Sequence, residues 1–269
     1  MGNDAELVFS YIRDNTDVSA PDNTKSIRMS TDGFCISVVS SQSQLEEFVH
    51  YTFAPNLSFK KKIESIVAVE KKQKVNYEHA VFKFYTHLNT QIPEEFYDRE
   101  EEHKIIPLLT DKTEHYVSLA EKVESWNLYT ISLWEAELVE EVQKAFPDFQ
   151  LSTVMASLMK FVSKQEKETV VVFVENNNFT IIAANKKGLL GANTFSFTNE
   201  TDFLYYCLAF LRKIFPKVDS LSLTLCGNIM EGSPLYRAVG KYFSSVTFVS
   251  QEDKDNFPLE NYSRYCDLF

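Results

Sequence analysis

Two stretches of the chain decide its fold: Lys25–Ser40, which reads KSIRMSTDGFCISVVS, and Thr169–Asn185, which reads TVVVFVENNNFTIIAAN. In each stretch, a run rich in β-branched and apolar residues meets a short polar turn and then a second such run. The turns are supplied by Asp32-Gly33 and by the asparagine run Asn176–Asn178. Both patterns are typical of β-hairpins.

The elements that follow each hairpin recur in the same order. Placing Phe34 on Phe179 aligns the hairpins at an offset of 145 residues, and Tyr51–Phe53 then falls on Phe195–Phe197 at an offset of 144. We expect third strands at Glu47–Ala54 and Leu189–Phe197, helices at Ser58–Lys74, Glu200–Phe215 and Pro234–Phe243, and further strands at Ala80–Leu88, Leu221–Cys226 and Val246–Val249. The pattern predicts a duplicated unit, and chance recurrence of a common hairpin-and-helix arrangement is the alternative.

The middle of the chain mixes strands and helices. We expect strands at Tyr116–Glu121 and Leu128–Leu133 and helices at Glu94–Glu102, Trp134–Phe146 and Ser152–Gln165. The fold class is therefore α/β (α+β), with a duplicated motif that builds two lobes on mixed five-stranded sheets. We expect a mobile N-terminal arm at 1–24, a first lobe at 25–150 and a second lobe at 151–269.

Composition excludes several classes of function. The chain has 269 residues, of which 44% are hydrophobic, enough to bury a substantial core. Its 7 glycines are scattered, so neither a GxGxxG dinucleotide loop nor a GxxxxGK[ST] phosphate loop can be assembled. The net charge of −11 argues against direct contact with nucleic acid.

Cysteine usage and hydropathy indicate a cytoplasmic protein. None of the 4 cysteines lies in a CxxC motif, and buried reduced thiols are the simplest interpretation. The chain begins without a secretory signal and contains no run of about 18 apolar residues, so we expect no insertion into a membrane.

Motifs for the common catalytic chemistries are missing. The 5 histidines all lie in the first 115 residues and form neither HExxH nor HxH, so we expect no metal site. No GxSxG motif or local Cys–His motif offers a nucleophile. Lys25–Thr31 and Ala80–Leu88 contain no acid, which argues against a two-metal nuclease. No catalytic residue is assigned.

The repeated β-β-β-α-β-α-β layout resembles the ribonuclease-H-like motif of the superfamily that holds actin, heat-shock ATPases and sugar kinases. The chain looks like an uncharacterised Bacteroidetes family with this actin-like ATPase superfamily fold. It is similar in layout to the actin-like proteins of pilus assembly and type II secretion. Asn89–Phe96, which reads NTQIPEEF, is typical of that branch, and the resemblance covers most of residues 25–250.

The resemblance implies a nucleotide site built from three turns. A DxG phosphate loop is expected in each hairpin, with an Asp that holds the water shell of Mg²⁺. At the first, Thr31-Asp32-Gly33 has Thr31 in place of that Asp, and we interpret Asp32-Gly33 as a type I′ structural turn.

The other two turns are altered as well. The second hairpin has Glu175-Asn176-Asn177, in which the asparagines suit a left-handed turn. The adenosine turn retains one glycine of two, in Cys226-Gly227-Asn228.

We therefore predict a catalytically inactive actin-like domain that acts as a binding or scaffold module with a protein partner and no cofactor. The alternative is a divergent actin-like ATPase or kinase, which would bind ATP and Mg²⁺ at these three turns. A third class, an accessory protein of a nucleic-acid process, is disfavoured by the negative charge. The oligomeric state stays open.

Overall fold

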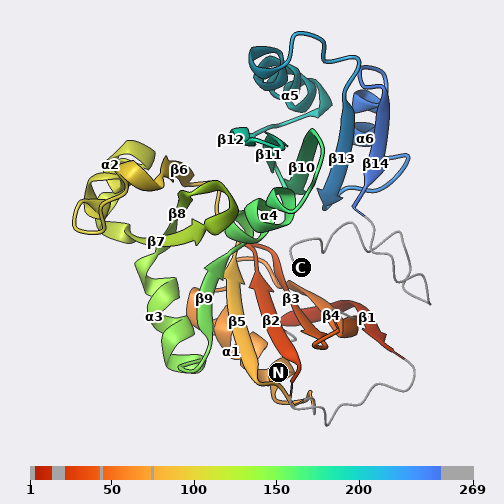
Figure 1. Cartoon of the computed structure of the whole chain (residues 1–269). Helices are drawn as coiled ribbons and strands as arrows, with labels where there is room; N and C mark the ends of the chain where they lie inside the picture. The colour runs from red at the N-terminus through yellow and green to blue at the C-terminus, as the bar shows by residue number, and fades with distance from the viewer. Residues whose placement is uncertain (1–3, 14–21, 43–44, 74–75, 250–269) are drawn as a thin grey trace. The chain divides into compact units, whose positions relative to one another are not determined.

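The computed structural model describes residues 4–13, 22–42, 45–73 and 76–249 (Figure 1). The chain divides into two compact units, each assembled from several segments. The first unit comprises Met1–Thr86, Tyr97–Glu121 and Ile131–Met155, and the second comprises His87–Phe96, Lys122–Thr130 and Ala156–Phe269.

The first unit is built on a six-stranded sheet with the order β1-β4-β3-β2-β5-β9. Its strands are β1 (Ala5–Ile12), β2 (Thr24–Met29), β3 (Gly33–Val39), β4 (Leu45–Phe53), β5 (His79–Phe84) and β9 (Gln150–Thr153). The neighbouring pairs β1–β4, β4–β3 and β3–β2 are antiparallel, whereas β2–β5 and β5–β9 are parallel.

Two helices pack on the apolar side of this sheet. They are α1 (Phe59–Glu70) and α3 (Ala136–Ala145). Ser58 begins α1 by accepting a hydrogen bond from the Lys61 backbone N–H. The sheet side chains Ile27 and Phe82 are fully buried against α1 and α3, so alternate strand residues and one helical stripe form a single core.

The second unit is built on a five-stranded sheet with the order β12-β11-β10-β13-β14. Its strands are β10 (Thr169–Glu175), β11 (Asn178–Asn185), β12 (Gly188–Ser196), β13 (Ser222–Gly227) and β14 (Ser245–Phe248). The helices α5 (Glu200–Ile214) and α6 (Pro234–Val239) pack on one face of it. The helix α4 (Val154–Ser163) precedes β10 and is buried along most of its length.

The remaining elements are short or belong to a third sheet. That sheet has three strands in the order β6-β8-β7, which are β6 (Asn89–Pro93), β7 (Tyr116–Val123) and β8 (Leu128–Glu135). Around it lie α2 (Ile106–Leu109) and the 3₁₀ turns η1 (Glu94–Phe96), η2 (Glu102–Lys104), η3 (Thr113–His115) and η4 (Glu124–Trp126). The acidic helix expected at Glu94–Glu102 is therefore wrong, because only its first turn is helical.

The two larger sheets agree in order and in register. β4-β3-β2-β5-β9 and β12-β11-β10-β13-β14 share the same strand directions, and Phe34 pairs with Tyr51 as Phe179 pairs with Phe195. The predicted alignment of the two hairpins is therefore confirmed residue by residue.

The N-terminal strand departs from the prediction. Ala5–Ile12, expected as part of a mobile arm, forms β1 and pairs antiparallel with β4. The first sheet therefore has six strands, where five were expected. Residues 14–21 of the expected arm lie outside the described residues.

The helix predicted at Ser152–Gln165 also begins later than expected. Gln150–Thr153 forms β9, and α4 starts at Val154. The carboxylate of Glu121 accepts hydrogen bonds from the Ser152 hydroxyl (2.8 Å) and from the Thr153 backbone N–H (2.9 Å) and hydroxyl (3.0 Å). These bonds hold both residues in the extended strand, so Ser152 does not cap the helix.

The type I′ turn proposed for Asp32-Gly33 is wrong. Neither residue has a positive φ, and the Ser30 backbone N–H bonds to the Gly33 carbonyl (2.9 Å), which makes Thr31 and Asp32 the central residues. Glycine is required at 33 for a different reason. A Cβ there would lie 2.4 Å from the carbonyl oxygen of Tyr51 on the neighbouring strand.

We therefore expect Gly33→Ala to destabilise the protein by about 1–3 kcal/mol, as overpacking against backbone does. Gly240→Ala is the matched control, because Gly240 has helical φ and its Cβ would make ordinary contacts; its effect should stay within about 0.5 kcal/mol. Urea denaturation of both variants measures the difference. Equal stability of the two variants would contradict the close approach to Tyr51.

Candidate functional site

Nearby side chains form hydrogen bonds to the polar groups of the turn between β2 and β3. The ammonium of Lys62, on α1, donates to the Thr31 carbonyl (2.7 Å) and lies over the Phe53 ring at 5.4 Å. The Ser30 hydroxyl donates to the Asp32 carboxylate (2.8 Å). A lysine and a hydroxyl thus bind the polar groups of the turn at which the resemblance implied a phosphate loop.

Lys62 also faces the charge of Glu135, the last residue of β8. Burial lowers the pKa of Lys62, and the carboxylates of Glu135 and Asp32 raise it part of the way back. Burial raises the pKa of Glu135, Glu137 raises it further, and Lys62 and His115 oppose the shift. The first hairpin is therefore coupled electrostatically to the start of α3.

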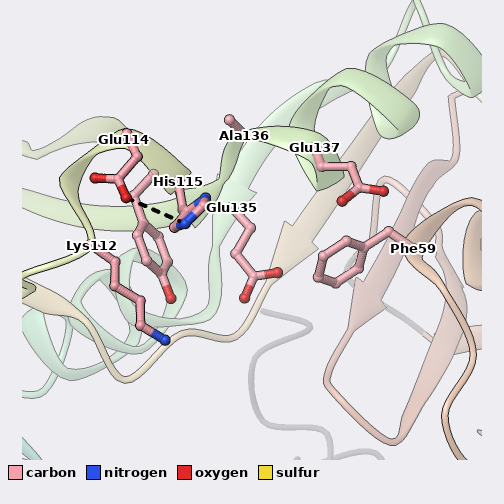
Figure 2. A pocket seen from close by; sticks show the side chains of 8 residues that line it. Phe59, Lys112, Glu114, His115, Glu135, Ala136 and Glu137 are labelled. Atoms are coloured by element: carbon pink, nitrogen blue, oxygen red, sulfur yellow. Dashed lines mark ion pairs between the residues drawn. The ribbon is translucent and has the colours of Figure 1, made fainter.

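A pocket of about 310 Å³ opens in the first unit beside this cluster (Figure 2). Its lining residues come from three separate parts of the chain and are Phe59, Lys112, Glu114, His115, Tyr116, Glu135, Ala136 and Glu137. The lining carries three carboxylates, one lysine, one histidine and two aromatic rings. We call it the acidic pocket.

Figure 2 shows how the charges of the acidic pocket are arranged. The carboxylates of Glu135 and Glu137 lie beside the Phe59 ring, while Glu114 pairs with its neighbour His115 at 3.4 Å. Glu135 precedes the first turn of α3 without a side-chain capping bond, which leaves its carboxylate directed into the pocket. Burial, and then the charge of Glu135, raise the pKa of Tyr116.

Sequence reasoning missed the acidic pocket completely. Phe59, Lys112 and Glu135 are far apart in sequence and belong to no motif. The residue spacing contains no signal that could have found it, because only the tertiary structure brings these elements together.

The second hairpin forms a tight turn. Asn176 adopts the left-handed conformation with a φ of 51°, as the asparagine run predicted. Glu175 is buried at 6% exposure, and the Asn177 carbonyl accepts from the Phe197 backbone N–H (2.8 Å). The side chain of Asn178 accepts from the Ser196 hydroxyl (2.7 Å).

The end of β13 is packed against the end of β10. Cys226 is fully buried, and Gly227 has a φ of 86°; a Cβ at Gly227 would lie 2.1 Å from the Val174 carbonyl oxygen, so only glycine fits there. That oxygen also accepts from the Asn228 backbone N–H (2.6 Å). The structure thus brings the turn at 175–177 and the turn at 226–228 together in the second unit, where glycine permits close contact between the strands.

The turn at Thr31-Asp32-Gly33 belongs to the first unit. Within the residues that the structure describes, no group of three or more His, Cys, Asp or Glu side chains could hold a metal ion. Among the helices of the described residues, none is long and apolar enough to cross a membrane.

The described cysteines are buried and form no disulfide among the described residues. They are Cys35, Cys207 and Cys226. Burial raises the pKa of the Cys207 thiol to about 12, which keeps it protonated and unreactive near neutral pH. Cys266 lies outside the described residues.

Solved structures of other proteins share the fold of this chain. A Bacteroides thetaiotaomicron protein with an actin-like ATPase fold and unknown function matches with a TM-score of 0.78 and 17% identity, over 93% of this chain and 95% of that one. PilM in the PilM–PilN type IV pilus biogenesis complex matches with a TM-score of 0.65 and 8% identity, over 93% and 96%. The cytoplasmic domain of EpsL, from the type II secretion system of Vibrio cholerae, gives a TM-score of 0.47 at 7% identity, over 88% and 90%.

The chain therefore has the actin-like ATPase fold, as the resemblance implied. It belongs to the family described as protein of unknown function (DUF3822), whose model matches residues 14–246. No curated protein matches it.

The raised pKa of Glu135 predicts a pH-dependent effect of Glu135→Gln. A carboxyl whose folded-state pKa lies above its unfolded value contributes less stability as the pH rises from about 4 through the folded-state pKa. The variant loses this dependence, so its stability relative to the native protein should be higher at pH 7 than at pH 4.

Urea denaturation at the two pH values measures this difference. Glu140→Gln, at an exposed position of α3, is the matched control and should show no such change. If the free energy of unfolding of Glu135→Gln differed from that of the native protein by the same amount at both pH values, the desolvation of Glu135 would be contradicted.

Proposed function

We propose that this chain is a catalytically inactive actin-like domain that binds another protein without a nucleotide or metal cofactor. One observation carries the proposal: Lys62 and Ser30 occupy the polar groups of the first hairpin turn, and Thr31 stands where the resemblance implies a metal-holding Asp. Phosphoryl transfer depends on a positioned Mg²⁺ and on donors aimed at the γ-phosphate. The proposal is that these parts have been replaced by internal contacts.

The second unit supports the same proposal. The Asn228 backbone N–H, a candidate donor near a bound nucleotide, is used by the Val174 carbonyl. Gly227 is needed for the packing of β13 against β10, so its presence has a structural explanation that requires no ligand. The altered turns are compatible with a fold retained for its shape.

The acidic pocket supplies the binding surface in this proposal. Its three carboxylates outnumber the single Lys112, and Phe59 and Tyr116 offer ring faces on which a cation can stack. This chemistry suits an Arg or Lys side chain of a partner protein. PilM, which shares the fold, is solved in a complex with PilN, and a protein-binding role for this fold is consistent with the proposal.

Two further parts of the proposal concern origin and location. The contact-by-contact agreement of the two sheets supports an internal duplication of one ancestral unit. The buried cysteines without disulfides are compatible with the reducing cytoplasm.

Phosphate release from Mg-ATP separates this proposal from its alternative, a divergent ATPase or kinase. We expect the purified chain to release no phosphate above the buffer rate. Asp32→Ala and Glu175→Ala alter the turns that an ATPase would use. Turnover near 1 s⁻¹, at the low end of the usual range for enzymes, that disappears in either variant would overturn the non-enzyme assignment.

Binding to the acidic pocket is tested with N-acetyl-arginine amide as the probe and its neutral analogue N-acetyl-citrulline amide as the reference. In NMR spectra at millimolar probe, the Tyr116 and Ala136 amides should shift with the arginine compound alone. Glu135→Gln should weaken this binding roughly 2- to 5-fold, as loss of one partly exposed ion pair does. Glu140→Gln should leave it unchanged. Equal shifts with both compounds, or with neither, would rule out cation recognition.

A further inference from the structure

No strand pairs with the outer edge of the second sheet in the part of the chain that the structure describes, although Trp126 of η4 lies near Gly188 at the start of β12. β12 pairs with β11 and with no other described strand. In the first unit the equivalent strand, β4, is covered by β1 over Ala5–Ile12. The same sheet order therefore carries an additional strand at this position in one unit and lacks it in the other.

The neighbouring β6 does not occupy this edge as a strand. Asn89 donates to the Thr194 hydroxyl (3.1 Å), which also bonds to the Thr180 hydroxyl (2.9 Å). Thr180 and Thr194 are a cross-strand pair, so this contact is made through side chains on one face of the sheet. The backbone along the outer side of β12 is left without a ladder partner among the described strands.

β12 has few of the features that protect an edge strand from pairing. Its nine residues, GLLGANTFS, include no charge and no proline. A register shift opposite Ala183 and Ala184 places a bulge near its start, and Gly191–Ser196 continues beyond it as a regular strand. Long, uncharged edges are templates for pairing with another strand.

The helix α5 runs antiparallel to β12 along this edge. Ile214, at the end of the helix, approaches Gly191 near the start of the strand. Tyr206, nearer the beginning of the helix, stacks on Phe195 near the end of the strand at 5.4 Å. Tyr205 projects beside it and is 65% exposed, so an aromatic surface adjoins the open strand.

Charge is segregated along this surface. Asp202, Tyr206, Ala209 and Lys213 are spaced 4, 3 and 4 residues apart and therefore share one side of α5, the side that Tyr206 places over β12. The acidic end holds Asp202. The basic end holds Lys213, and Lys187 lies before the start of β12 at that same end.

We propose that two copies of this chain associate through β12 and α5 across a twofold axis perpendicular to the sheet. Antiparallel pairing of the two β12 strands puts the Lys213 end of each copy against the Asp202 end of the other, whereas parallel pairing would bring like charges together. The contact is isologous, so each complementary pair occurs twice. The sheet continues across the axis, as β1 continues the sheet of the first unit within one chain.

Sedimentation equilibrium from about 1 to 100 μM measures the association of the full chain. We expect a dimer in this range. Lys213→Glu places an acid against Asp202 of the other copy, and should weaken the dimer roughly 3- to 10-fold because the affected pair occurs twice. Lys241→Glu, an exposed lysine beyond α6, carries the same charge change away from β12 and should leave the dimer unchanged.

A double reversal tests the orientation. Asp202→Lys combined with Lys213→Glu restores opposite charges across an antiparallel interface, so the double variant should recover most of the lost affinity. The Asp202 carboxylate also accepts from the Thr198 backbone N–H (3.2 Å), so circular dichroism is needed to test whether the double variant is folded. If it is unfolded, the dimer affinities of Lys213→Glu and Lys213→Met are compared instead, because these two variants differ in charge at one site. A monomer at 100 μM, or equal weakening by Lys213→Glu and Lys241→Glu, would overturn the proposal.

Discussion

The strand that follows each hairpin, β4 in the first sheet and β12 in the second, is tied to the hairpin turn by one backbone hydrogen bond at its end. The Phe53 N–H bonds to the Asp32 carbonyl at 2.7 Å, and the Phe197 N–H bonds to the Asn177 carbonyl at 2.8 Å. This bond fixes the turn against the strand that leads into the next helix. Because α1 begins six residues after Phe53, the position of Lys62 over the first turn follows from it.

In the proposed function, the charges around the first turn account for the loss of Mg²⁺ binding. A turn that holds Mg²⁺ through a carboxylate needs that carboxylate exposed to the ion's water shell. Here the ammonium of Lys62 donates to the Thr31 carbonyl, and the carboxylates of Glu135 and Asp32 raise the pKa of Lys62 against the effect of burial. Glu135 also lines the acidic pocket, where Glu137 and Glu114 supply two further carboxylates.

Local patterns predicted the strands and helices that carry strong periodicity. The alignment of Phe34 with Phe179 holds because both side chains are buried between the sheet and its first helix, and a one-residue slip would reverse every side chain. β1 was missed because apolar and polar residues alternate weakly along this edge strand, which forms only by pairing with β4. The Asp-Gly pair marked a turn, but its type depended on the approach of Tyr51 from a third strand, which no local pattern contains. The acidic pocket was missed for the same reason, since Phe59 and Glu135 meet only through the tertiary structure.

The acidic character of the chain and its proposed self-association are compatible because charge is distributed unevenly. At physiological salt, charges more than about 8 Å apart are largely screened. The net charge of −11 therefore acts weakly between two approaching copies, while pairs in contact at an interface are screened less. Along β12 no charge has to be desolvated, and at its two ends Asp202 and Lys213 are opposite in sign. An edge with this distribution favours one orientation of its partner, and that selectivity comes from the ends of α5 while the backbone of β12 supplies the pairing groups.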